Sequence, residues 1–422
     1  MRNSAIHVIG AGLAGLAAAV RLTAAGAKVV VHEAAAQAGG RCRSYYDHAV
    51  GMVIDNGNHL LLSGNHAALA FLRTIGGAHG LSGPATTEFP FVDLAAKERW
   101  RLRPNAGRLP WWIFDPRRRA PGTTAFSHLG IARLLWAPSG SPIGAAMACT
   151  GAAYDRLWRP ILLAALNTDP AEADAGLAAA VIRETLLVGG RACRPLIARD
   201  GLSATLVDPA IRYLEARGAA VRLEHNLHAF RFDGPRVSAL DFGQDVVSLA
   251  PDDAVVLATP PFMAKTLLPG LQAPDAFRAI VNAHFAVEPP PGFPPMIGVL
   301  NGTIEWIFAF PGRLSVTISG ADRLLAIPRE TLAYTIWREV AAVGGIADKM
   351  PPWQIVRERR ATFAALPEQN AKRPGAKTEW DNLVLAGDWT ATGLPATIEG
   401  AIRSGNRAAE LLNPRVRGRT KP

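Results

Sequence analysis

A glycine-rich turn between a predicted strand and a predicted helix constrains this chain more than any other feature. Residues 6–22 are predicted to form a short buried strand, the turn Gly10-x-Gly12-x-x-Gly15 and an amphipathic helix. Gly10 allows the tight turn, Gly12 lets the backbone approach a pyrophosphate, and Gly15 lets the helix and the strand pack closely. The N-terminus of the helix offers free N–H groups and a partial positive charge to phosphates. The turn therefore predicts a strand–helix unit that binds a dinucleotide.

A second predicted strand supports the same site. Residues 29–33 end at Glu33, eighteen residues after Gly15, where a carboxylate is placed to accept a hydrogen bond from an adenosine ribose. Two alternatives are a glycine-rich helix cap that binds nothing and a signal peptide. The glycines, the length of the apolar run and the lack of a basic leader followed by a cleavage site argue against a signal peptide. We also expect three neighbouring residues at the cofactor: Leu13, Ala14 and Ala34.

Composition limits the class of protein. The chain has 422 residues, of which 49% are hydrophobic and 19% charged, so we expect a globular protein with more than one domain. It contains no uninterrupted run of eighteen apolar residues, so no transmembrane helix is predicted. The net charge of +10 suits nucleic acid or an anionic membrane, and the lack of a nucleic-acid module favours the membrane. A generally Arg-rich composition is the alternative explanation.

Cysteine usage excludes two further classes. The three cysteines, Cys42, Cys149 and Cys193, are not closely paired in sequence. That pattern fits a reducing compartment and excludes a disulfide framework or a cysteine-type zinc site. We therefore expect no metal centre and a cytoplasmic location.

Two more segments indicate FAD rather than NAD. Gly39 and Gly40 let the backbone pass close to a ligand, and the Arg41 that follows can face a phosphate or the flavin edge. Far along the chain, Gly387 and Asp388 end a predicted buried strand, and the carboxylate can accept a hydrogen bond from a ribityl hydroxyl. An NAD enzyme has no need of this distant half-site. The alternative for the first segment is an ordinary loop.

A predicted helix start completes the C-terminal half-site. The chain turns into its last predicted helix at Ala396, Thr397 and Ile398. Its N–H groups can point at the pyrimidine end of an isoalloxazine, where a reduced flavin carries negative charge. The alternative is a plain helix N-cap made by Thr397. The three sites together predict FAD as the cofactor.

These three sites resemble the FAD-binding amine oxidase and phytoene desaturase superfamily. Four further segments give a narrower resemblance: Asp55-Asn-Gly-Asn-His59, residues 157–168, residues 200–210 and residues 393–405. They resemble the squalene-associated FAD-dependent desaturases, the hydroxysqualene dehydroxylases of hopanoid-producing bacteria. Asn58 departs from the family, which more often has Gln there, and so does the segment 63–66. We also expect five more residues at the cofactor: Asn56, Gly57, Asn58, His59 and Leu227.

The resemblance implies the architecture. We expect an α/β, two-domain, FAD-binding Rossmann-like fold of the amine oxidase (GR2) type, with an inserted α+β substrate domain. The FAD-binding parts are expected at residues 1–76, 199–265 and 356–422, and the substrate parts at residues 77–198 and 266–355. Alternating patterns predict strands over 221–227 and 229–240 and an antiparallel sheet within 280–325, while 329–343 is predicted to be a helix.

The resemblance also implies a reaction, which is a reductive loss of water. Protonation of the allylic hydroxyl of hydroxysqualene lets water leave, and reduced FAD then delivers a hydride from its N5 position to give squalene. The protein would supply a long, dry, apolar tunnel, one acid near the hydroxyl, and a flavin face held close.

The candidate acids are His59 and Asp55, because their segment follows the Gly-Gly-Arg loop toward the flavin. Histidine is a suitable proton donor near neutral pH. The alternative is that both side chains only tie the loop down. Asn167 and Glu305 are weaker candidates, since polar residues in apolar stretches more often satisfy backbone groups.

Residues 110–119 contain four bulky apolar residues beside three arginines. Such a segment can enter a bilayer while its cations meet lipid phosphates, and we expect peripheral contact with the inner face of the bacterial membrane. The alternative is a lid packed on the substrate domain, with a solvated arginine run. The basic tail of Arg415, Arg417, Arg419 and Lys421 is expected to be disordered. Upstream enzymes of the squalene pathway are expected partners.

Three other functions compete. A carotenoid-type desaturase of the same superfamily differs only in the direction of hydride flow, which a sequence does not show. An amine oxidase usually surrounds the flavin with an aromatic cage, and the region before Gly387 offers Trp380 but no clear pair. A non-catalytic protein that binds prenyl lipids on the same fold would lack a working flavin.

Overall fold

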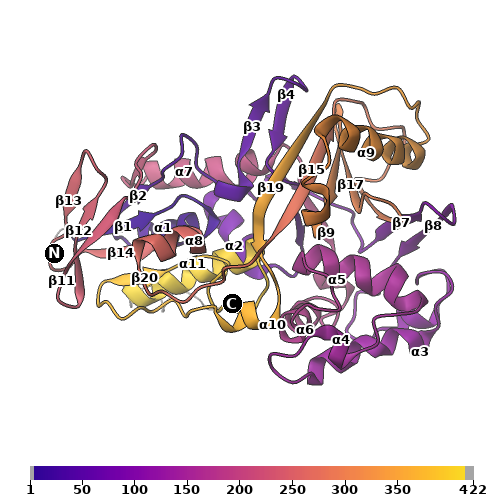
Figure 1. The fold of residues 1–422 in the computed structure, drawn as a ribbon, viewed down its shortest axis with the longest axis horizontal. Coiled ribbons are helices and arrows are strands. Elements are labelled where there is room, and N and C mark those ends of the chain that lie inside the picture. The colour runs from indigo at the N-terminus through magenta and orange to yellow at the C-terminus, as the bar shows by residue number, and fades with distance from the viewer. Residues whose placement is uncertain (1–3, 414–422) are drawn as a thin grey trace.

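The computed structural model describes residues 4–413. The predicted basic tail lies outside the described residues. Figure 1 shows a parallel sheet near the N-terminus at one end of the molecule, and a larger sheet with several helices at the other end. The long strands β15 and β19 run between these two parts (Figure 1).

The first sheet has five parallel strands in the order β10-β2-β1-β14-β20. The three central strands are rich in Val and Ile, as expected for strands covered on both faces. Its strands come from three separate stretches of chain, so residues far apart in sequence meet at one sheet edge. The bounds are β1 Ala5–Ile9, β2 Lys28–His32, β10 Ala220–Arg222, β14 Ala254–Leu257 and β20 Leu383–Leu385.

Two helices pack unusually closely beside this sheet, α1 (Leu13–Ala24) and α11 (Ile398–Leu412). A Cβ on Gly405 would lie 2.1 Å from the carbonyl oxygen of Ala14, so only glycine allows this approach. Both helices begin at the same cavity, described below, and their contact fixes the two N-termini relative to each other. Three further helices belong to this half: α2 His66–Ile75, α7 Asp208–Glu215 and α8 Pro261–Leu267.

The second sheet has seven strands in the order β19-β15-β18-β17-β16-β7-β8. All neighbours are antiparallel except β16 and β7, which are parallel. One face packs on α9 (Arg329–Gly344) through a core that includes Phe285 and Trp337, whose rings are 5.1 Å apart. The bounds are β7 Phe89–Asp93, β8 Glu98–Leu102, β15 Phe277–Phe285, β16 Met296–Leu300, β17 Trp306–Phe310, β18 Arg313–Ile318 and β19 Trp353–Phe363.

The other face of the large sheet meets a group of helices in a second core, which includes Phe91, Trp306 and Phe308. These helices are α3 Ala125–His128, α4 Ile143–Ala146, α5 Arg159–Leu166 and α6 Ala175–Glu184. The remaining elements are β3 Ser44–Asp47, β4 Met52–Asp55, β5 Leu60–Leu62, β6 Leu81–Ser82, β9 Pro195–Ala198, β11 Ala229–Asp233, β12 Arg236–Asp241, β13 Val246–Ser248 and α10 Pro367–Ala371.

The prediction of an antiparallel sheet within residues 280–325 agrees with β15 to β18, but the strand predicted over 221–227 is too long. Only β10 pairs, as a parallel edge strand. After it, Glu224 adopts a left-handed conformation (φ 52°), and the backbone N–H of His225 donates to the carbonyl of Glu33. The chain therefore turns along the end of β2 instead of extending the strand.

Candidate cofactor and substrate site

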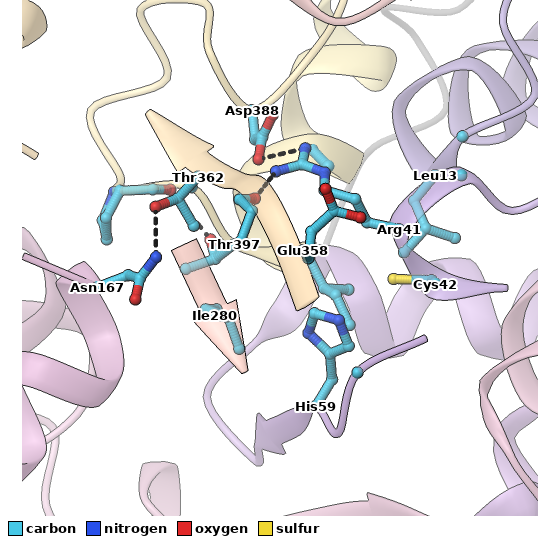
Figure 2. A pocket seen from close by; sticks show the side chains of 18 of the residues that line it. Leu13, Arg41, Cys42, His59, Asn167, Ile280, Glu358, Thr362, Asp388 and Thr397 are labelled. Atoms are coloured by element: carbon cyan, nitrogen blue, oxygen red, sulfur yellow. Dashed lines mark hydrogen bonds and ion pairs between the residues drawn. The ribbon is translucent and has the colours of Figure 1, made fainter. Parts of the chain in front are cut away.

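A cavity of about 970 Å³ lies where the two sheets meet. It is at the upper end of the roughly 300–1,000 Å³ typical of ligand sites. Residues that the sequence assigns to the cofactor line it from all three stretches of the parallel-sheet half. Figure 2 shows five of them, Leu13, Arg41, His59, Asp388 and Thr397. These lining residues are Gly10, Gly12, Leu13, Ala14, Glu33, Ala34, Gly39, Gly40, Arg41, Asn56, Gly57, Asn58, His59, Leu227, Gly387, Asp388, Ala396, Thr397 and Ile398.

The glycine turn opens toward this cavity. Gly10 has φ 103°, and a Cβ there would lie 2.8 Å from the carbonyl oxygen of Ala258. Gly12 has no atom within 4 Å of a Cβ position, and no side chain caps the N-terminus of α1. Gly15 does not line the cavity; a Cβ there would lie 1.9 Å from the carbonyl oxygen of Gly10, so it serves close packing. The turn thus offers uncapped N–H groups to an anion.

Glu33 lies at the end of β2, at the edge of the cavity. Its Oε2 accepts a hydrogen bond from the backbone N–H of Ala11 at 2.7 Å, and its Oε1 accepts one from Ala35 at 3.0 Å. These bonds hold the carboxylate beside the glycine turn. Ala34 and Leu227 line the cavity with it, so the residues expected around an adenosine lie together.

The sequence reasoning missed a string of three histidines beside Glu33. The Nδ1 of His7 lies 3.0 Å from Nε2 of His32, whose Nδ1 lies 2.8 Å from Nδ1 of His225. Burial, together with the neighbouring imidazoles, lowers the pKa of His32 to about 3, so this ring is neutral at pH 7. His32 and His225 line the cavity. The spacing of these histidines in the sequence does not predict their contact, because they meet only through the pairing of β1, β2 and β10.

The two distant half-sites meet through an ion pair. The guanidinium of Arg41 donates to the Asp388 carboxylate at 2.7 Å and to the carbonyl of Ala361 at 2.5 Å (Figure 2). The two partners are 347 residues apart in the chain. The arginine expected to face the cofactor and the acid expected to bind it therefore orient each other at the cavity wall.

The start of α11 completes this wall. Thr397 caps the helix, since its Oγ1 accepts a hydrogen bond from the N–H of Gly400 at 3.0 Å. The sequence reasoning missed Arg373, which donates to the carbonyl of Asp388 at 3.0 Å and to Oγ1 of Thr392 at 2.9 Å. Burial lowers the pKa of Arg373 to about 10. This arginine holds the loop between β20 and α11 in place.

His59 and Asp55 lie in different surroundings. His59 lines the cavity, and burial, with the charge of Arg41, lowers its pKa to about 4, so its imidazole is neutral at pH 7. Asp55 is buried and is not among the residues that line the cavity. Its Oδ1 accepts hydrogen bonds from Ser44 Oγ at 2.6 Å and from the N–H of Leu202 at 2.8 Å. These contacts support the alternative in which Asp55 ties the loop down.

Further polar groups lie near His59. The amide of Asn56 donates to Glu358 at 3.3 Å, and that of Asn58 donates to Oγ1 of Thr317 at 3.1 Å. Figure 2 shows Glu358 between Arg41 and His59. The sequence reasoning missed Glu358, since a single acid in the Arg-rich strand β19 looks like a surface residue.

The part of the cavity beneath the large sheet is mostly apolar. Its few polar groups include Asn167 and Thr362, joined by a 2.9 Å hydrogen bond from the Asn167 amide to Thr362 Oγ1 (Figure 2). Asn167 ends α5 in a left-handed conformation (φ 49°), and its Oδ1 accepts from the N–H of Gly320 at 2.7 Å. The Asn167 amide also donates to the carbonyl of Arg278 at 3.3 Å, so this side chain satisfies backbone groups, as its alternative predicted. The apolar lining includes Phe89, Leu102, Ile161, Val181, Ile182, Leu186, Met296, Trp306 and Phe308.

Glu305 precedes Trp306, which lines this apolar part. Burial raises the pKa of Glu305 to about 7, so the carboxyl is partly protonated near neutral pH. Its Oε2 accepts a hydrogen bond from the N–H of Ser319 at 2.8 Å, and Ser319 itself lines the cavity. The pair can therefore hold a proton close to the apolar space.

Residues 13–413 match the family described as flavin containing amine oxidoreductase. A hydroxysqualene dehydroxylase of Rhodopseudomonas palustris is 62% identical over 97% of this chain and 98% of its own length. Proteins of the same name from Sinorhizobium fredii and Zymomonas mobilis are 58% and 47% identical, over 96% and 97% of this chain and 97% and 99% of their own lengths.

Solved structures share the fold. Cyclohexylamine oxidase from Brevibacterium oxydans has a TM-score of 0.70 at 17% identity, covering 97% of this chain and 98% of that protein. A putative protoporphyrinogen oxidase from Exiguobacterium has a TM-score of 0.67 at 17% identity, covering 99% and 100%. These likenesses, with the parallel sheet and the second mixed sheet, confirm the predicted two-domain, FAD-binding α/β fold.

Proposed function

This chain belongs to the family of flavin containing amine oxidoreductases, in which its relatives of 47–62% identity are hydroxysqualene dehydroxylases, and from that premise we propose that it reduces hydroxysqualene to squalene. It is an FAD-dependent oxidoreductase. The observation that supports this substrate most strongly is the 62% identity to a hydroxysqualene dehydroxylase over nearly the full length of both chains.

The residues present fit FAD. Uncapped N–H groups at Gly12 suit a pyrophosphate, the Glu33 carboxylate suits a ribose, and the start of α11 suits the electron-rich end of a flavin. We propose that the lining residues named above, from Gly10 to Ile398, hold the cofactor. We also propose the domain division made from the sequence, with residues 1–76, 199–265 and 356–422 forming the cofactor part.

The proposed reaction balances as hydroxysqualene plus FADH2 giving squalene, water and FAD. When bound and reduced, FAD would supply one hydride, whose electron pair forms the new C–H bond, while one proton leaves with the hydroxyl as water. The chain supplies the surroundings: apolar walls such as Trp306 and Phe308 hold the hydrocarbon and exclude water that would recapture an allylic cation. The polar groups at Thr362 and Ser319 offer the substrate hydroxyl a place to bind.

Two groups are proposed as proton donors to that hydroxyl. His59 lines the cavity, but its pKa of about 4 leaves the ring as neutral imidazole at pH 7, and the N–H of a neutral imidazole is too weak an acid to protonate an alcohol. A protonated Glu305 can pass its proton to the Ser319 hydroxyl, which in turn protonates the substrate oxygen and releases water. The raised pKa and the contact with a lining residue support Glu305 over His59.

A second function is an oxidative desaturase, which would remove hydrogen from a polyene. A probable zeta-carotene desaturase of Synechococcus elongatus is 22% identical over 96% of this chain and 98% of its own length. That identity is far below the 62% of the hydroxysqualene dehydroxylase, so the reductive reaction is the better-supported proposal.

Location and partners are also proposals. Among residues 4–413, no helix is long and apolar enough to cross a bilayer. We propose a cytoplasmic protein that contacts the inner face of the bacterial membrane peripherally and receives its substrate from upstream enzymes. The reason is chemical, because a C30 hydrocarbon alcohol is insoluble in water and resides in lipid.

Product analysis tests the proposed function. Purified protein with FAD and an excess of chemical reductant, kept anaerobic, is given hydroxysqualene, phytoene or a polyamine in separate reactions. We expect squalene from hydroxysqualene, identified by mass, and no product from the other two. A parallel set holds oxidised FAD and no reductant. Desaturated phytoene in that set, with hydroxysqualene untouched in the reduced set, would favour the desaturase instead.

A further inference from the structure

Six large apolar side chains are exposed within a short stretch of chain on the helical side of the large sheet. They lie on the loop before η3 (Trp111–Phe114), on η3, on α3, and on η4 (Leu129–Trp136). The six, with their exposed fractions, are Leu109 81%, Trp111 51%, Phe114 68%, Phe126 80%, Leu129 52% and Trp136 78%. We call these residues, with the arginines among them, the 109–136 surface.

The exposed side chains of η3, α3 and η4 are not part of the hydrophobic core. The same helices bury Trp112, Ile113, Ile131 and Leu134, each less than 9% exposed, on their inner side. The rings of Trp112 and His128, 5.4 Å apart, join η3 to α3. Short helices that are apolar on both faces, with one face already packed, leave the outer face without a partner in the folded chain.

The charge of this stretch identifies the partner. Residues 105–137 contain five arginines and one acid, a net charge of +4: Arg108, Arg117, Arg118, Arg119, Arg133 and Asp115. The Arg118 guanidinium lies 4.5 Å from the centre of the Trp111 ring, and Arg117 is 92% exposed at its side chain. Arginines beside exposed aromatic rings suit an anionic phospholipid layer, where rings enter the acyl region and cations meet phosphates. Pairing two copies of this surface would bring like charges together.

The 109–136 surface adjoins the wall of the cavity. The guanidinium of Arg183 on α6 donates to the carbonyl of Leu135 on η4 at 3.1 Å, and α6 also supplies Val181 and Ile182 to the cavity lining. Figure 1 shows α6, α4 and α3 in the half of the molecule away from β1 and β2, with α3 at its far end. A lipid layer on this surface would therefore meet the substrate end of the cavity and not the cofactor end.

We propose that the 109–136 surface docks the protein on an anionic phospholipid bilayer, with the substrate end of the cavity held against the lipid. Phe126, Leu129 and Trp136 extend the contact well beyond residues 110–119. The proposal deepens the proposed function, because docking lets a water-insoluble polyprenoid alcohol pass between lipid and cavity without crossing water. The docking itself is measurable whether or not that substrate is correct.

Vesicle sedimentation tests the docking with the full chain loaded with FAD. We expect the protein to sediment with vesicles containing phosphatidylglycerol at low salt, and to be released in high salt or with pure phosphatidylcholine. The double variant Phe114→Ser with Phe126→Ser should bind at least tenfold more weakly. Arg117→Glu should weaken binding to the anionic vesicles and leave binding to pure phosphatidylcholine unchanged. Tyr334→Ser, which removes a half-exposed ring from α9, is the matched control and should bind normally.

Melting temperature and turnover distinguish a loss of docking from a loss of folding or of catalysis. The double variant should keep its melting temperature and its turnover of detergent-dispersed hydroxysqualene, yet lose turnover of the same substrate embedded in vesicles. Equal vesicle binding by the double variant and the parent protein would overturn the proposal, and so would a dimer that the double variant dissociates. A protein that docks as expected but never converts hydroxysqualene would contradict the proposed function alone.

Discussion

Burial determines the protonation state of two titratable side chains around the cavity, His59 and Glu305. It lowers the pKa of His59 to about 4 and raises the pKa of Glu305 to about 7. The usual assumption, a charged acid and a readily protonated histidine, is therefore reversed at these two positions. A proton donor can be chosen between them by experiment, because the two groups titrate in different pH ranges.

The substitution Glu305→Gln tests the proton donor. Because its folded pKa of about 7 lies above the ordinary 4.5, Glu305 is protonated in the fold below pH 7 and loses its proton as the pH rises through that value. We expect kcat/KM of the parent protein to fall above pH 7, and Glu305→Gln to lose at least tenfold in kcat while still binding substrate.

Stability gives an independent readout of the same group. The carboxyl stabilises the fold fully below pH 4.5 and loses this contribution as the pH rises through about 7, so Glu305→Gln should be the more stable protein at pH 8. Glu330→Gln, an exposed acid on α9, should change neither profile. Full activity of Glu305→Gln with an unchanged pH profile would remove Glu305 from the proton path and return the role to His59.

The substitution Glu33→Gln tests the adenosine end of the cofactor site. It keeps the shape of the side chain but replaces the carboxylate that lies beside the glycine turn. Hydrogen bonds to a charged group contribute about 1.5–3 kcal/mol, so we expect the Kd of FAD to rise roughly tenfold or more. Titration of flavin fluorescence into the apoprotein measures this, with Glu215→Gln on α7 as the control. An unchanged Kd would mean that FAD does not contact this carboxylate.

At the scale of elements, the close pair of helices α1 and α11 positions the two halves of the cofactor site. Both N-termini point at the cavity, and Gly405 lets the helices approach to backbone contact. A side chain on Gly405 must push α11 away from Ala14. The geometry of the cofactor site therefore depends on a residue on α11 outside the cavity lining.

The substitution Gly405→Ala tests this dependence. A Cβ 2.1 Å from the Ala14 carbonyl oxygen forces the helices apart, and overpacking of this kind costs about 1–3 kcal/mol. We expect a lower melting temperature and weaker FAD binding together. Gly375→Ala is the matched control, because Gly375 has open space at its Cβ position and should tolerate the change. A destabilised Gly405→Ala protein with normal FAD affinity would show that the helix spacing does not control the site.

At the scale of the whole molecule, the features that could be predicted from the sequence are those that depend on short local patterns of residues. Gly10, Glu33, Arg41 and Asp388 could be assigned to one cofactor because each lies at the end of a recognisable strand or turn. The ion pair between Arg41 and Asp388 could not be predicted, because neither segment contains a pattern that indicates a partner 347 residues away.

The residues that were missed depend on tertiary contacts. Arg373 and Glu358 look like ordinary surface charges in sequence, and only the fold buries the first and turns the second into the cavity. Asp55 is the reverse case. Its motif predicted a catalytic acid, but its carboxylate accepts hydrogen bonds from Ser44 and Leu202. Roles of single polar residues are thus set by neighbours distant in sequence, whereas the fold and cofactor are set by local spacing.

The most direct test of the account is a single anaerobic turnover. Protein whose bound FAD has been reduced is mixed with one equivalent of hydroxysqualene, while flavin absorbance is followed and the products are extracted. The account predicts that the yellow absorbance of oxidised flavin returns and that squalene appears in equal amount. Flavin that stays reduced in the presence of hydroxysqualene, or flavin that reoxidises without squalene, would contradict it.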